Sequence, residues 1–311
     1  MFSYVKTSRY HIYKGVIIIS QRKADLIIAL ITIAWGSSYL FMKMGLDSID
    51  VFNLVALRFG IAFLLTAPIF YKKLCNIDKK TLLYGGILGA ALFCVLSTLM
   101  FGLKTTSASS AGFLAGTTVI FVPLLQIIIH GKKPTLPITA GVFLTIIGIG
   151  LLTIDITFQL DKKSLLCVLA AFIYAGQILL TSYFSKMVDP LALGVLQLGF
   201  AGIFGLLFSF IFEQPRLPAN SVEWLAVLSL SVVCSAFGFI LQPVAQKYTT
   251  PERTGILFSL EPVFSAIFGF IFLHEVLKVQ GYLGAILVFS GVIISGINKK
   301  RCVLKSITKE K

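Results

Sequence analysis

The sequence predicts an all-α integral membrane protein with ten transmembrane helices, arranged as two inverted five-helix repeats. Its composition, ten long apolar segments and a weak internal repeat support this prediction. Of the 311 residues, 57% are hydrophobic and only 13% are charged, and the mean hydropathy is +0.93. Soluble domains are about 25% charged. This chain has too few polar side chains to cover a water-facing surface, so lipid must surround most of it.

The formal net charge of +14 does not indicate a nucleic-acid partner. The basic residues lie between the apolar segments, and they do not form one face with interleaved aromatic side chains. Charge in that position is typical of membrane topology, and a phosphate-binding surface would need the other arrangement. We therefore expect a lipid bilayer and no nucleic acid.

The first half of the chain, residues 26–154, contains five of the predicted spans. Each must hold about 20 apolar residues to cross a bilayer. Charged or turn-forming residues separate them, namely DSID, KKLCNIDKK, KTT and HGKKPT in that order. The spans are 26–46, 52–71, 82–103, 107–130 and 136–154. Residues 1–25 are predicted to be a cytoplasmic N-terminal extension.

The second half, residues 163–297, contains the other five spans. Their separators are SKMVDP, EQPRLPANS, KYTTPE and HEVLK. The spans are 163–185, 191–212, 221–246, 252–273 and 278–297. Residues 298–311 are predicted to be a basic cytoplasmic tail.

The distribution of Lys and Arg sets the expected orientation. If the N-terminus is cytoplasmic, 20 of the 27 Lys and Arg residues fall on the inside and six on the outside, with Arg58 within a span. Basic residues gather on the cytoplasmic side of membrane proteins. We therefore expect a multi-pass protein of the plasma or inner membrane with both termini in the cytoplasm.

Two constant offsets relate the halves of the chain. Residues 24–60 shifted by 139, and residues 104–148 shifted by 143, align small and polar positions. The matched pairs include Trp35 with Tyr174, Ser38 with Gln177, Arg58 with Gln197, Gly141 with Gly284, and Gly148 with Gly291. Chance alignment of glycines is the alternative explanation. Since each half has an odd number of spans, the second half would enter from the opposite side, which is typical of secondary transporters.

Glu261 and Pro262 stand in the middle of the ninth apolar segment, GILFSLEPVFSAIF. A carboxylate at the centre of a membrane helix costs about 2.5–3.5 kcal/mol on insertion scales. It can hydrogen-bond neighbouring backbone, or it can be a site for a proton or for a cationic part of a substrate. Pro262 is predicted to be a hinge because it leaves a carbonyl one turn back without its helix bond.

Six further residues are candidates for a substrate site. Arg58, within the second span, is either a structural cation or an anchor for a substrate carboxylate. Trp35 lies at mid-depth although tryptophan favours the interface, so it and Ser38 are candidates for a cavity wall. Tyr174, Gln177 and Gln197 occupy the matched positions of the second half. Whether Arg58 approaches Glu261 is open at this point.

The sequence gives no sign of catalysis, of a metal or of a cofactor. It contains no GxSxG, no HExxH and no GxxxxGK[ST], which excludes the common serine hydrolase, zinc protease and P-loop motifs. The five cysteines include no CxxC pair and are interpreted as apolar fillers. We expect neither catalytic residues nor metal ligands.

Several segments resemble one known family of membrane proteins. They are AWGSSYLFMKMGL (34–46), LRFGIAFLL (57–65), TTPERTGILFSLEPVFSAIFGFIFLHE (249–275) and GYLGAILVFSGVIISG (281–296). The chain resembles the EamA family of the drug/metabolite transporter superfamily over nearly all of residues 24–297. The resemblance implies ten helices in inverted repeats, a central cavity, and export or exchange of small metabolites.

The expected function is therefore secondary transport of a small molecule by alternating access. A zwitterion such as an amino acid would suit a buried Arg and a buried Glu. Protons or a counter-substrate are the candidate coupling partners, and both a monomer and a homodimer remain open. A polytopic membrane enzyme or a channel without recognisable catalytic motifs is the alternative.

Overall fold

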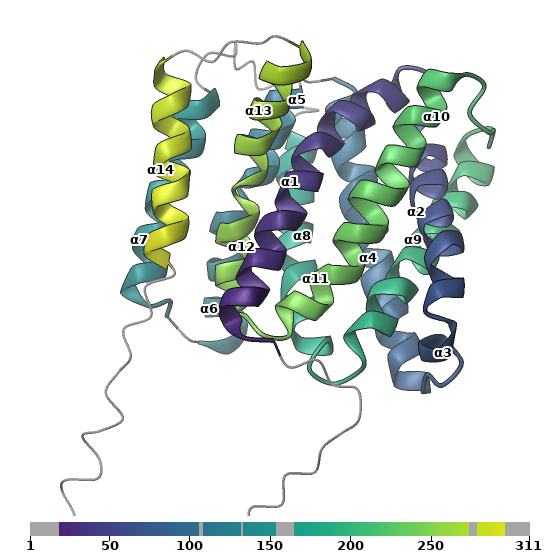
Figure 1. Ribbon diagram of the computed structural model, residues 1–311, viewed down its shortest axis with the longest axis horizontal. Coiled ribbons are helices and arrows are strands. Elements are labelled where there is room, and N and C mark those ends of the chain that lie inside the picture. The colour runs from purple at the N-terminus through teal and green to yellow at the C-terminus, as the bar shows by residue number, and fades with distance from the viewer. Residues whose placement is uncertain (1–18, 106–107, 132, 154–164, 274–278, 296–311) are drawn as a thin grey trace, which may run out of the picture.

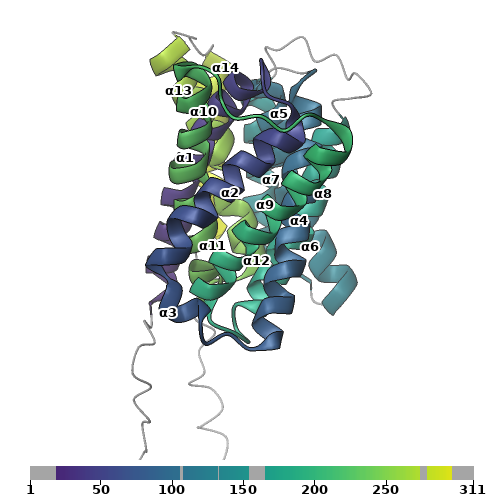
Figure 2. The same cartoon turned by 90° about the vertical axis from the view of Figure 1, so that its right-hand side faces the viewer.

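The computed structural model describes residues 19–105, 108–131, 133–153, 165–273 and 279–295. These residues form helices and their connections, without any β-strand in the described ranges. Residues 1–18 of the predicted extension and the whole basic tail lie outside them. The helices run roughly side by side, with their connections at two opposite ends (Figures 1 and 2).

In its described residues, the first half holds seven helices. They are α1 (Gln21–Leu46), α2 (Val51–Ile69), α3 (Tyr71–Leu74), α4 (Lys79–Leu103), α5 (Ala108–Gly116), α6 (Thr118–His130) and α7 (Leu136–Thr153). The second half holds α8 (Leu165–Phe184), α9 (Pro190–Phe212), α10 (Ser221–Leu228), the π-helix η1 (Ser229–Phe237), α11 (Gly238–Gln246), α12 (Pro251–Phe258), α13 (Glu261–Leu273) and α14 (Val279–Ser295).

Six helical runs are long and apolar enough to cross a membrane by length and composition. They are α1, α2, α4, α8, α9 and the continuous run from Ser221 to Gln246. The remaining apolar helices are shorter. The structure is thus all-helical in its described part, with six long apolar helices and several shorter ones.

Short polar side chains set where several helices begin. Each accepts a hydrogen bond from a backbone N–H in the first turn, which would otherwise lack a partner inside the helix. The residues are Ser20, Asp78, Asp189, Asn220 and Thr250. The turn signals in the sequence therefore mark real helix starts.

Two of the predicted spans are interrupted at matched positions. The fourth breaks at Thr117, between α5 and α6, and the ninth breaks at Ser259 and Leu260, between α12 and α13. The offset of 143 places Thr117 on Leu260. Pro262 lies in the first turn of α13, where a missing N–H costs least. The break lies just before Glu261 and Pro262. Pro262 was expected to bend one continuous helix, and the structure instead has two helices that meet at this point.

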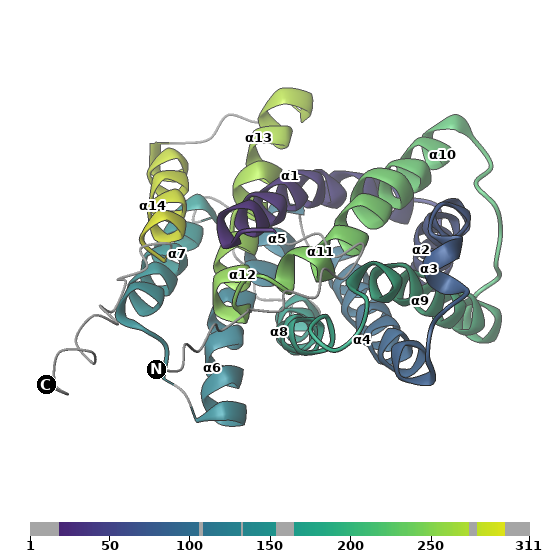
Figure 3. The ribbon, with the colours of Figure 1, turned by 60° about the horizontal axis from the view of Figure 1, so that its bottom comes forward.

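Close helix pairs form the two edges of the molecule. At one edge α7 packs on α14, and at the other α2 packs on α9 (Figure 3). A Cβ added at Gly148 would lie 2.6 Å from the carbonyl oxygen of Gly284, and one added at Gly141 would lie 2.8 Å from that of Gly291. Only glycine permits this approach of two backbones.

Candidate functional site

A cavity lies in the middle of the molecule, between segments of both halves. Its volume is about 60 Å³, which is room for a few water molecules. Helices α1, α2, α4, α5 and α6 line it from the first half, and α8, α11, α12 and α13 line it from the second. Both helix breaks contribute to the wall, through Gly116 and Thr118 at one and Ser259 and Glu261 at the other.

Trp35 of α1 forms the aromatic centre of this cavity. Its indole Nε1 donates a hydrogen bond to the carbonyl oxygen of Cys234 at 2.8 Å. Cys234 belongs to η1, where the wider π-helical turn departs from the α-helical hydrogen-bond pattern. This bond fixes a large side chain at a depth where tryptophan is otherwise uncommon.

Three more aromatic rings surround Trp35. The centroid distances from its ring are 4.8 Å to Phe239, 4.9 Å to Phe258 and 6.1 Å to Tyr174. Tyr174 also stacks on Phe258 at 5.7 Å. The Tyr174 hydroxyl is buried and has no hydrogen-bond partner. The rings therefore make an apolar wall that carries an unpaired polar atom.

Arg58 of α2 supplies a buried positive charge. The residue is 1% exposed, and its Nε donates to the Ser235 hydroxyl of η1 at 2.6 Å. Its guanidinium also lies 5.4 Å from the ring centroid of Phe59 and 6.0 Å from that of Phe239. Its Nη1 has no partner. Burying an unpaired donor of a charged group is costly, so this nitrogen is available to an anionic ligand group.

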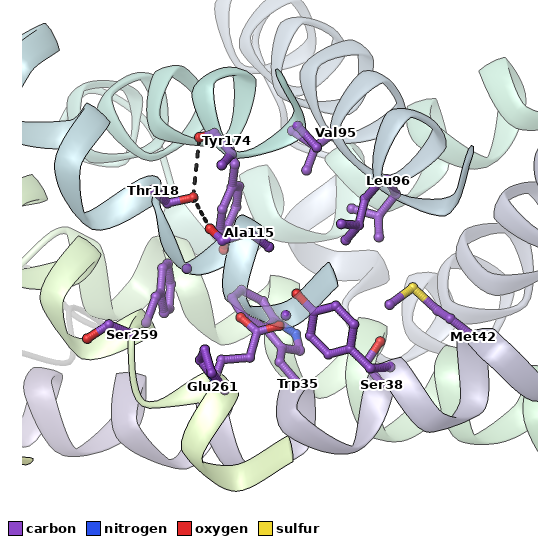
Figure 4. Close-up of a pocket in the computed structure, with 18 of the residues that line it drawn as sticks. Trp35, Ser38, Met42, Val95, Leu96, Ala115, Thr118, Tyr174, Ser259 and Glu261 are labelled. Carbon is purple, nitrogen blue, oxygen red and sulfur yellow. Dashed lines mark hydrogen bonds between the residues drawn. The ribbon is translucent and has the colours of Figure 1, made fainter. Parts of the chain in front are cut away.

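Glu261 supplies the opposite charge from another side. It is the first residue of α13, directly after the break at Ser259 and Leu260. Figure 4 shows its carboxyl pointing into the cavity, near the side chain of Trp35. Tyr39 of α1 and Arg58 of α2 line the same cavity as this carboxyl. No ion pair within 4 Å joins Arg58 to Glu261, two residues that the structure describes fully. Both charges therefore face one cavity while remaining separate.

The structure brings most of the predicted site residues together. Trp35, Ser38, Arg58, Tyr174 and Glu261 all line the cavity, together with the predicted hinge Pro262. Gln177 and Gln197 do not line it. The sequence left open whether Arg58 approaches Glu261. In the structure both residues line the cavity, and they form no ion pair with each other.

Gln177 and Gln197 instead belong to a chain of side-chain amides. Gln242 Nε2 donates to Gln177 Oε1 at 3.2 Å, and Gln177 Nε2 donates to Gln197 Oε1 at 3.3 Å. Gln197 Nε2 then donates to the carbonyl oxygen of Phe239 at 2.6 Å. The three amide side chains are fully buried. The chain ends at the cavity wall, because Phe239 is a lining residue.

Sequence reasoning did not select several residues of the site. Tyr39 follows Trp35 by four residues and therefore lies on the same face of α1, which was a usable signal. Thr118 also lines the cavity, and its hydroxyl donates to the carbonyl oxygen of Ala115 at 2.7 Å (Figure 4). Ser235 carries no signal, because nothing in the sequence indicates a π-helix there.

Charged residues at the helix ends form ion pairs away from the cavity. Lys73 Nζ lies 2.7 Å from Asp189 Oδ2, and Lys104 Nζ lies 3.1 Å from Asp50 Oδ1. Burial raises the pKa of Asp189, but hydrogen bonds from Lys73 and from backbone amides outweigh it, so the pKa lies below its ordinary value. Among the described residues, no group of three or more His, Cys, Asp or Glu could hold a metal ion.

Comparison with known families identifies the family to which the chain belongs. The model of the EamA-like transporter family matches residues 22–154 and matches again at residues 162–297. The chain belongs to the EamA-like transporter family. The family model therefore matches twice, once in each half of the chain.

Individual relatives carry the same general name. An uncharacterized transporter of Archaeoglobus fulgidus is 30% identical over 272 residues, which cover 87% of this chain and 85% of the relative. A second uncharacterized transporter of that organism is 28% identical and covers 88% and 97%. The uncharacterized transporter YoaV of Bacillus subtilis is 25% identical and covers 88% and 96%. This EamA-family chain is therefore a multi-pass membrane protein of a transporter family.

A solved structure supports the fold. A crystal structure of a protein superposes with a TM-score of 0.74 at 19% identity, covering 89% of this chain and 97% of the other. At that identity the likeness concerns the fold alone.

Proposed function

We propose that this EamA-family protein is a secondary transporter that moves a small molecule with a positive and a negative group across the cell membrane. One observation carries the proposal: Arg58 and Glu261 face a single cavity at mid-depth without pairing with each other. Charged residues inside a membrane mark substrate or ion pathways. The unpartnered Arg58 Nη1 and Tyr174 hydroxyl add capacity for polar ligand groups.

The mechanism would be alternating access between two inverted five-helix halves. Contacts between glycines support the inversion, because the offset of 143 turns one glycine contact into the other. Gly141 faces Gly291, and the exchanged pair, Gly284 and Gly148, also face each other. The matched breaks in the fourth and ninth spans add support, since interrupted helices in corresponding places typically form transporter sites. Ten crossings and cytoplasmic termini are part of this proposal.

The cavity must widen before a metabolite can enter. About 60 Å³ holds only a few waters, so the halves would have to move apart on one side at a time. Glu261 would respond to the ligand by gaining or losing a proton, which would couple transport to a proton gradient. Export or exchange is the expected direction, and no catalytic step is assigned.

Reconstituted protein tests the role of Glu261. A thermal-shift screen of amino acids and other small zwitterions in detergent first selects a ligand. Proteoliposomes containing a pH dye then report proton movement when that ligand is added. Wild type and Asp50→Asn, which alters an exposed acid at a helix end, should both move protons, and Glu261→Gln should not. Proton movement that persists in Glu261→Gln would remove the coupling role.

A further inference from the structure

The contact between α8 and α11 contains an unusual number of buried polar atoms without partners. We call this contact the α8–α11 seam and define it by Gln177 and Thr181 of α8 and Gln242 and Gln246 of α11. All four side chains are fully buried. Thr181 Oγ1, Gln242 Oε1 and both polar atoms of Gln246 lack a hydrogen-bond partner.

This seam continues the wall of the central cavity. On α8, Tyr174 lines the cavity, and Gln177 and Thr181 follow it on the same helix face at three and seven residues. On α11, Phe239 lines the cavity, and Gln242 and Gln246 follow at the same spacings. Both helices end at the same end of the bundle (Figure 1), next to Lys186 and Lys247.

The hydrogen bond between Gln242 and Gln177 closes the seam directly below the cavity. Beyond it lie the unpartnered atoms of Gln246 and Thr181. Gln246 lacks partners for both its donor and its acceptor. A cation would satisfy only the acceptor, whereas water satisfies both kinds of group. Water is therefore the ligand that fits this set of side chains.

The equivalent contact in the first half has the opposite chemistry. The offset of 139 carries Gln177 and Thr181 onto Ser38 and Met42 of α1, and the offset of 143, extended by one helical segment before residue 104, carries Gln242 and Gln246 onto Leu99 and Leu103 of α4. We call this the α1–α4 seam. Met42, Leu99 and Leu103 are buried and apolar. The two related seams, at opposite ends of the bundle, thus differ in their affinity for water.

We propose that the α8–α11 seam is a water-binding passage from the central cavity to the bundle end that carries Lys186 and Lys247, and that the Gln177–Gln242 amide pair closes it. In the α1–α4 seam, Ser38, Met42 and Leu99 line the central cavity, and beyond them the apolar side chain of Leu103 closes the seam and keeps it dry. Opening of the α8–α11 seam lets water satisfy side chains that are unpartnered in the closed form, so the opening loses little hydrogen bonding. As a route for substrate, the passage rests on the proposed transport function.

Cysteine reactivity tests the passage without any substrate. The five native cysteines are first replaced by alanine. A single cysteine is then introduced at Gln246 or at its matched position, Leu103, and both of these residues are 0% exposed. N-ethylmaleimide is the probe, because it reacts with thiolates in contact with water. The extent of labelling of the denatured protein is used to normalise the labelling rate of each folded variant. Thr181→Cys is a second variant in the seam, and it changes the size of the side chain little.

The expected result is labelling of Gln246→Cys and Thr181→Cys at about ten times the rate of Leu103→Cys, because opening of the seam exposes them to water. Adding Gln177→Leu, which breaks the amide pair, should raise labelling of Gln246→Cys about fivefold. Equal rates at Gln246→Cys and Leu103→Cys, or no effect of Gln177→Leu, would overturn the proposal. The rates do not depend on transport, so failure of the passage and failure of the transport function are separable.

Discussion

Ser235 supports the central cavity at the scale of a single residue. Its hydroxyl accepts the hydrogen bond from Arg58 Nε, and no other hydrogen bond of that guanidinium occurs in the described residues. Arg58 therefore depends on η1 for its position. The cavity keeps a positive charge because one hydroxyl and two aromatic rings hold it.

Ser235→Ala should destabilise the protein by about 1–3 kcal/mol, because a buried charged donor would lose its partner. Thermal unfolding in detergent measures the change. Ser231→Ala is the matched control: it is also buried in η1, but its shortest hydrogen bond, at 2.7 Å, runs to Val227 of the preceding helical turn. Equal losses for the two variants would contradict a special role for Ser235.

Residue type and depth were enough to predict part of the site. An arginine and a glutamate at mid-depth are costly in lipid, and a tryptophan is uncommon there because it favours the interface, so Trp35, Arg58 and Glu261 could be selected without a structure. The amides Gln177 and Gln197 met the same criterion but hydrogen-bond each other. A sequence does not say which buried polar groups satisfy one another, and this limited the prediction.

Helix packing at the scale of elements depends on single glycines. Where α2 meets α9, a Cβ added at Gly202 would lie 2.8 Å from the backbone nitrogen of Gly60. A Cβ added at Gly60 itself meets nothing within 4 Å. The Cβ direction of Gly202 points at the backbone of Gly60, whereas that of Gly60 points into open space, so only position 202 requires glycine.

Gly202→Ala should lower the free energy of unfolding by about 1–3 kcal/mol, since the added methyl group overpacks two backbones. Gly60→Ala should be neutral or stabilising by up to about 1 kcal/mol, since alanine favours the helix. Unfolding in a denaturing detergent would compare them. A larger loss at Gly60 than at Gly202 would show that the two helices pack differently.

Element boundaries were partly predictable. The turn clusters placed two span starts, at 191 and 252, next to the observed helix starts at Pro190 and Pro251, because a side-chain cap is a local signal. The interruptions at Thr117 and at Ser259 lie inside uniformly apolar segments, where hydropathy gives no boundary. Pro262 indicated a bend in the ninth segment, and the fourth segment has no proline at its break.

The orientation in the membrane is a property of the whole molecule. From the distribution of Lys and Arg we expect the segment from Phe70 to Asp78 inside the cell and the segment from Glu213 to Asn220 outside. Cys75 and Leu217 are exposed in these two segments. They lie at opposite ends of the bundle and can report its orientation.

A membrane-impermeant maleimide checks this orientation in intact cells. With Cys75 as the sole cysteine, labelling should require permeabilised cells. With Leu217→Cys as the sole cysteine, labelling should occur in intact cells. The reverse pattern would invert the topology and move both termini to the outside.

The π-helix also has a consequence for the register of its span. A wider turn holds more residues per turn than an α-helix, so the faces of α10 and α11 are rotated relative to each other about their common axis. Glu223 packs at one end of this run and Gln242 near the other. Deleting one lipid-facing residue, Val232 or Val233, would straighten the run and turn Cys234 and Ser235 away from Trp35 and Arg58. The cavity could thus be lost through a residue that never touches it.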